Sequence, residues 1–201
     1  MKKRNILLLL STLLATISLA ACSSSMNTKG KGIAQLMNDN QERVFYSTNA
    51  SSIDDPSPAK NGAILRIYIT KGGKLKAYTT SSSNLKMDDV IGKNIDEVKK
   101  LAEENSNETY EIDKVAAKVT TDSSGNNTKG EDITLYIFDN KPTYTFFDSL
   151  TSGQIRDKYY AGYVEVHRGG VNAPGILITE VSKGDVINFD KADGKIVKEG
   201  K

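Results

Sequence analysis

The sequence predicts an α+β fold: mainly an antiparallel β-sheet or a partly closed barrel built from hairpins, with one packed amphipathic helix. Three observations favour it. Short segments of alternating apolar and polar residues recur along the chain, most connections between them are too short for a crossover helix, and one stretch has a strong helical pattern. Of the 201 residues, 38% are hydrophobic and 26% charged, which is typical of a globular chain with room for one domain.

The clearest predicted element is a β-hairpin over residues 64–80. Its first strand alternates apolar and polar side chains, so Ile67 and Arg66 face opposite sides of the sheet. Gly72 and Gly73 supply the positive φ angles that a tight connection needs. We therefore expect two paired antiparallel strands here.

The clearest predicted helix begins at Asn94 and ends near Glu104. Asn94 is a good N-cap, and Glu97 lies three residues later as the reciprocal partner of a capping box. The apolar residues of this segment recur at helical spacing and form one stripe: Ile95, Val98, Leu101 and Ala102.

The remaining elements follow from weaker patterns. A short helix is expected from Ile33, and a helical turn within 149–158. A second hairpin is expected over 109–138, with a long polar tip at 122–132. Further strands are predicted at residues 44–46, 143–147, 159–167, 175–181, 185–189 and 195–198.

The N-terminal segment has the pattern of an export signal. Lys2, Lys3 and Arg4 form a basic head without acidic residues, and 6–21 is an almost uninterrupted apolar and small-residue stretch. As a helix this stretch would be ~24 Å long, which is shorter than the ~30 Å hydrocarbon core of a bilayer. A secretory signal is therefore favoured over a transmembrane span.

The end of this stretch is more specific. Leu19, Ala20, Ala21 and Cys22 resemble the lipobox of bacterial lipoproteins, in which an aliphatic residue and two small residues precede an obligatory cysteine. The resemblance implies that Cys22 receives a diacylglyceryl group with acyl chains such as palmitate, and that a lipoprotein signal peptidase cuts between Ala21 and Cys22. Two acyl chains give stable membrane anchoring. A plain secretory signal with a chance cysteine is the alternative.

These boundaries divide the chain into a signal peptide (1–21), a lipidated flexible tether (22–32) and a single β-rich globular domain (33–201). The mature part is similar to small lysine- and asparagine-rich lipoproteins of Gram-positive bacteria. Removal of the signal lowers the count of basic residues from 27 to 24, against 25 acidic residues. The mature chain is thus almost neutral, and no nucleic-acid partner is expected.

Composition excludes several kinds of chemistry. One cysteine and one histidine allow no disulfide framework, no Cys/His zinc site and no Cys–His dyad with a free thiol in the mature domain. Asp190, Asp193 and Gly194 superficially resemble a calcium loop, but Ala192 stands where an oxygen ligand is required, so the segment is interpreted as a turn and no metal site is assigned. No cofactor loop and no catalytic residue are assigned.

The best candidate for a ligand-binding face lies around the only histidine. Tyr163, Glu165 and His167 alternate along one face of a predicted strand, and Arg168 follows them. Together these side chains could form a polar binding surface or an acid/base pair near neutral pH. The more ordinary interpretation is a solvated strand face opposite the core.

The sequence therefore predicts a lipid-anchored protein on the outer side of the cell membrane. The function that the sequence favours is a non-catalytic binding or accessory module of the cell envelope, since no catalytic, metal or cofactor pattern is present. The expected partners are the membrane, through the lipid anchor, and another envelope protein or a wall glycan. The alternatives are a carboxylate-dependent envelope hydrolase and a small solute-binding lipoprotein of a transporter.

Overall fold

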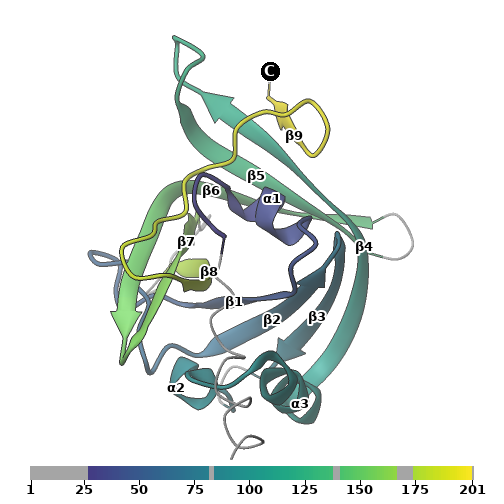
Figure 1. The fold of residues 1–201 in the computed structure, drawn as a ribbon, viewed down its shortest axis with the longest axis vertical. Coiled ribbons are helices and arrows are strands. Elements are labelled where there is room, and N and C mark those ends of the chain that lie inside the picture. The colour runs from purple at the N-terminus through teal and green to yellow at the C-terminus, as the bar shows by residue number, and fades with distance from the viewer. Residues whose placement is uncertain (1–26, 82–83, 138–140, 167–173, 201) are drawn as a thin grey trace, which may run out of the picture.

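The computed structural model describes residues 27–81, 84–137, 141–166 and 174–200, which form a closed antiparallel β-barrel (Figure 1). Its eight strands follow the order β3-β2-β1-β8-β7-β6-β5-β4, and β3 pairs with β4 to close the ring. The strands are β1 (Arg43–Asn49), β2 (Ile64–Lys71), β3 (Lys74–Thr80), β4 (Ser106–Thr121), β5 (Thr128–Ile137), β6 (Lys141–Ile155), β7 (Lys158–Glu165) and β8 (Gly175–Val181). The predicted mainly antiparallel, barrel-like sheet is confirmed, and the barrel is fully closed.

The predicted hairpin of residues 64–80 is confirmed as β2 and β3. Lys71 and Lys74 form the last antiparallel pair, and the intervening Gly72 and Gly73 have φ angles of 60° and 79°. A β-carbon is strained at such angles, so the two glycines fix the length of the turn and with it the register of the hairpin.

Close approach of the β7 and β8 backbones requires a glycine at position 162. Gly162 is paired with Ile178, and a β-carbon on Gly162 would lie only 1.9 Å from the carbonyl oxygen of Leu177. Any larger residue would push the two strands apart. The glycine therefore holds the wall of the barrel together at this point.

The inside of the barrel is filled by the short helix α1 (Ile33–Met37), which lies within the ring of strands in Figure 1. Ile33, Ala34, Leu36 and Met37 have no exposed surface. They pack against inward-facing side chains from most of the strands, among them Phe45, Tyr68, Ile112, Val115, Phe147 and Tyr163. Eight-stranded barrels are just wide enough to hold side chains or one small ligand, and here a helix of the same chain lies in that space.

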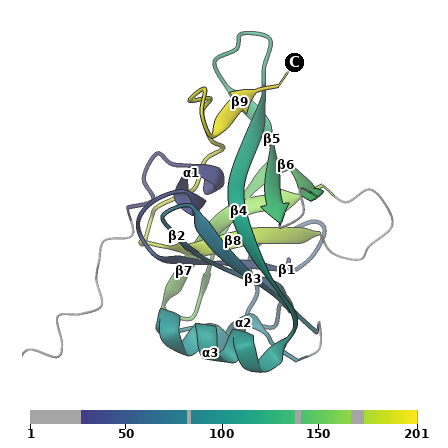
Figure 2. The same ribbon diagram turned by 90° about the vertical axis from the view of Figure 1, so that its right-hand side faces the viewer.

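A second apolar cluster lies between the outer face of the barrel and the helices α2 (Met87–Val90) and α3 (Ile95–Asn105). Figure 2 shows these two helices on the outside of the strands. Val98 and Ala102 of α3 pack there with outward-facing residues such as Ile67 and Tyr78. The predicted capping box is confirmed, because the Asn94 side chain accepts a hydrogen bond from Glu97 N at 3.0 Å and Glu97 Oε2 accepts one from Asn94 N at 2.8 Å.

Two expected elements differ from the structure. The predicted helical turn in 149–158 is wrong, because residues up to Ile155 continue strand β6 and pair with β7. The strand predicted at 185–189 is also absent: this segment has no regular structure, and Ile187 in it is buried against the inner core. After it, the three-residue strand β9 (Val197–Glu199) pairs in parallel with β4.

Candidate functional site at the mouth of the barrel

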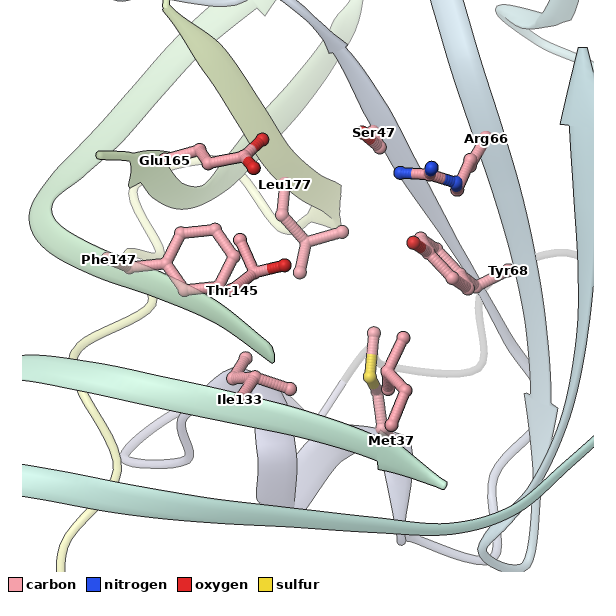
Figure 3. Close-up of a pocket in the computed structure, with 10 residues that line it drawn as sticks. Met37, Ser47, Arg66, Tyr68, Ile133, Thr145, Phe147, Glu165 and Leu177 are labelled. Carbon is pink, nitrogen blue, oxygen red and sulfur yellow. The ribbon is translucent and has the colours of Figure 1, made fainter. Parts of the chain in front are cut away.

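A pocket with a volume of about 30 Å³ opens beside α1 at the mouth of the barrel (Figure 3). Met37 of α1 contributes to its apolar lining together with Phe147 and Leu177. A buried water needs roughly 10–15 Å³ on the same measure, so the enclosed part of the pocket holds about two or three water-sized groups, and a larger ligand would extend out of the mouth. The complete lining is Met37, Ser47, Arg66, Tyr68, Ile133, Leu135, Thr145, Phe147, Glu165 and Leu177.

Two opposite charges face each other across this pocket. Arg66 comes from β2 and Glu165 from the end of β7, and Figure 3 shows their charged groups pointing toward the space between them. Arg66 is exposed and Glu165 is half-buried. Within the described part of the chain, neither forms an ion pair of 4.0 Å or less. Both charges are therefore available to a ligand.

Hydroxyl groups complete the polar part of the pocket. Burial raises the pKa of the Tyr68 hydroxyl; the neighbouring Arg66 opposes this effect and the charge of Glu165 adds to it, so this phenol stays protonated at neutral pH. Ser47 and Thr145 lie on other strands of the same lining. The mouth thus combines one cation, one anion and neutral hydrogen-bonding groups above an apolar lining.

A second polar cluster holds α1 inside the barrel. Asp190 accepts hydrogen bonds from the backbone N–H groups of Gly32, Ala34 and Gln35, at 3.0, 2.8 and 3.3 Å. A β-carbon on Gly32 would lie 2.3 Å from Asp190 Cγ, so the carboxylate reaches the start of the helix only because residue 32 is a glycine. Asp190 therefore caps α1 from more than 150 residues away in the sequence.

Glu131 and Tyr163 support this capping carboxylate. Glu131 Oε2 accepts a hydrogen bond of 2.9 Å from Asp190 N, and the Tyr163 hydroxyl lies 3.0 Å from the same oxygen. The Tyr163 oxygen in turn accepts a hydrogen bond of 3.0 Å from Ile33 N, at the first residue of α1. We call Glu131, Tyr163 and Asp190 the helix latch, because all three connect the barrel to the start of α1.

Burial and mutual repulsion keep one proton on the two carboxyl groups of the latch. Burial and the adjacent Asp190 charge raise the pKa of Glu131 to about 9. Burial also raises the pKa of Asp190, against the lowering effect of its hydrogen bonds from Glu131 and from the backbone of α1. At neutral pH Glu131 is therefore the protonated partner.

The latch does not have the arrangement of a carboxylate-dependent hydrolase. Such enzymes place two carboxyl groups on either side of a cleft that admits the substrate. Here Glu131 is 0% and Asp190 1% exposed, and neither lines the mouth pocket. Their oxygens accept hydrogen bonds from the backbone instead, so we assign the pair a structural role.

The structure places two of the four residues of the predicted ligand face. Tyr163 is fully buried in the barrel, where it belongs to the helix latch, whereas Glu165 lines the mouth pocket. His167 and Arg168 lie outside the described residues, as do the lipobox residues Leu19, Ala20 and Ala21 and the predicted lipidation site Cys22.

The sequence analysis did not identify the other polar residues of the mouth. Arg66, Tyr68, Ser47 and Thr145 have no motif spacing, and they come together only because the barrel closes. The only local signal concerns two of them: strand alternation puts Arg66 and Tyr68 on the same face of β2.

Comparison of this chain with models of protein families, with curated proteins and with solved structures finds no match. Within the described ranges, no helix combines the length and apolar character that crossing a membrane requires. Function must therefore be argued from the site itself.

Proposed function

We propose that this protein is a membrane-anchored, extracytoplasmic binding module that holds a small ligand in the mouth of its barrel. The observation that carries the binding role is the mouth pocket, in which two opposite charges without an ion-pair partner among the described residues stand above an apolar lining. Pockets that combine apolar walls with a few convergent polar groups are the usual form of small-molecule sites. The lipobox at residues 19–22 supports the anchoring.

The start of the folded body keeps the barrel close to its anchor. Thr28 is fully buried, and its hydroxyl donates a hydrogen bond of 3.2 Å to Asp185. From Cys22 to Thr28 the chain spans at most ~20 Å even when fully extended. A lipid on Cys22 therefore holds the end of the barrel that contains Thr28 near the membrane surface.

The mouth then faces away from the membrane. Arg43 begins β1 next to the anchored end, where its guanidinium donates a hydrogen bond to the carbonyl oxygen of Asn27 at 3.4 Å. Ser47 lies four residues further along the same strand and lines the pocket, ~13 Å away at the usual rise of a β-strand. The pocket thus opens on the side away from the membrane and the tether, where a ligand outside the cell can enter it.

The same pocket favours one second candidate, a small solute-binding lipoprotein of a transporter. Both functions require capture of a small molecule, and they differ in what happens to it afterwards. A permease that binds the loaded protein would distinguish the transporter receptor from a module that only retains its ligand.

A pocket-filling substitution tests the binding role. In Thr145→Trp the indole would occupy the mouth, so we expect the variant to lose a low-mass ligand that the wild type retains. The measurement is native mass spectrometry of detergent-extracted full-length protein after incubation with the small-molecule fraction of spent culture medium. The control is Ser152→Trp, an exposed position on β6 that is not part of the lining.

The expected result is a ligand adduct on the wild type and on Ser152→Trp, and none on Thr145→Trp. The same far-UV circular dichroism spectrum for all three proteins would show that they are folded. No adduct on the wild type, or an equal adduct on Thr145→Trp, would contradict the proposed function.

A further inference from the structure

We infer that the mouth pocket recognises a small zwitterion, a molecule that carries one carboxylate and one ammonium group on a short apolar body. The inference rests on the proposed function and names the class of its ligand. Arg66 would bind the carboxylate and Glu165 the ammonium group, one from each side of the pocket.

The pairing of charges selects against the other ligand classes. A simple anion attracted by Arg66 meets the negative charge of Glu165 in the same small space, and a simple cation meets Arg66 in the same way. A neutral molecule would leave both charges unsatisfied when it displaces their water. Only a ligand with both charges satisfies both side chains.

The rest of the lining sets the size and shape of the ligand. Met37, Phe147 and Leu177 offer apolar contact to one or two methyl groups and no further charge. The volume of about 30 Å³ admits only a small side chain, so the charged groups of the ligand would lie at the open edge of the pocket, beside the exposed Arg66. The Tyr68 hydroxyl, which stays protonated, is a neutral donor beside Arg66 on the same face of β2. An amino acid with a small branched side chain has this combination of features.

Three related probes test the inference on the detergent-extracted full-length protein. Valine carries both charges, 3-methylbutanoate lacks the ammonium group, and 2-methylpropylamine lacks the carboxylate. Ligand-observed NMR titration gives the dissociation constant of each. We expect valine to bind at least tenfold more tightly than either analogue, because each analogue loses a charge-assisted hydrogen bond and meets an unpaired like charge.

Variants at the two charges identify the site. Arg66→Gln and Glu165→Gln should each weaken valine binding about tenfold or more, and should reduce the preference for valine over the analogue that lacks the corresponding charge. The matched control is Arg156→Gln, at an exposed arginine in the turn after β6 that pairs with Asp88 at 2.7 Å and is not part of the lining. This variant should bind valine like the wild type.

The outcomes separate this inference from the proposed function. If both analogues bind as tightly as valine, or if Arg66→Gln and Glu165→Gln bind valine like the wild type, the zwitterion inference is overturned. The zwitterion inference is also overturned if valine does not bind while the wild type retains a different ligand that Thr145→Trp loses. In that case the proposed binding function still stands. Absence of any ligand in both experiments removes the inference and the function together.

Discussion

Replacement of Asp190 by alanine is expected to lower the free energy of unfolding by about 3–5 kcal/mol, because it leaves buried backbone donors at the start of α1 without an acceptor. Asp190 is 1% exposed and accepts hydrogen bonds from Gly32, Ala34 and Gln35. Water cannot replace the carboxylate without opening the barrel. Urea denaturation followed by far-UV circular dichroism measures the change.

Asp193 offers a matched control for this substitution. It also accepts three backbone hydrogen bonds, from Lys195, Ile196 and Val197 at 2.7, 2.8 and 2.9 Å, but it lies in an exposed turn. In Asp193→Ala water can solvate the released donors, so the loss of stability should be much smaller. If Asp190→Ala and Asp193→Ala lost equal amounts of stability, burial of the helix latch would add nothing to the free energy of unfolding, contrary to the structure.

The helix latch is also expected to make the protein less stable as the pH rises from about 5 to about 9. The pKa of Glu131 is raised from 4.5 to about 9 by folding, so the folded state holds a proton that the unfolded state releases within this range. The stability that this proton contributes is fully present below the unfolded-state pKa of 4.5, and it is lost as the pH rises through the folded-state pKa of about 9. Asp190, whose pKa is also raised, contributes with the same sign.

Glu131→Gln isolates this effect. Glutamine keeps the acceptor for Asp190 N and cannot ionise, so the variant should lose most of the slope between pH 5 and pH 9. The variant is therefore expected to exceed the wild type in stability near pH 9. Urea midpoints at pH 5, 7 and 9 measure both slopes. Parallel slopes for the two proteins would mean that Glu131 does not hold the proton.

Local patterns were sufficient to predict those parts of the fold that depend on neighbouring residues. The hairpin of β2 and β3 follows from its alternation and from Gly72 and Gly73, whose φ angles are positive as expected. The capping box of α3 follows from Asn94 and Glu97. In each case the deciding interaction joins residues within a few positions of one another, so the sequence displays it directly.

The closure of the barrel has no such local signal. The pairing of β3 with β4 depends on the curvature of the whole sheet, and that pairing decides which side of each strand is inside. In β2 the apolar Ile67 faces the outer cluster under the helices, whereas Tyr68 faces the interior and Arg66 the mouth. Alternation separates the two faces of a strand without saying which of them faces the interior.

The helix latch also has no local signal in the sequence, because its members are far apart along the chain. In the sequence Asp190 belongs to a calcium-like segment whose ligand pattern Ala192 interrupts. Its actual partners, Gly32 and Ala34, lie more than 150 residues earlier. Likewise, Glu131 gave no sign of burial in a polar segment, and its raised pKa arises only from the enclosed position beside Asp190.

The most direct test of the central claim, that a lipid on Cys22 holds this barrel at the membrane, is a comparison of the full-length protein with its Cys22→Ser variant. Both are expressed in a bacterium that processes lipoproteins, and the fraction of each that sediments with washed membranes is measured. We expect the wild type to sediment until detergent is added, and the variant to remain in the soluble or secreted fraction, because serine cannot receive the thioether-linked lipid. Equal sedimentation of the two proteins would contradict the account.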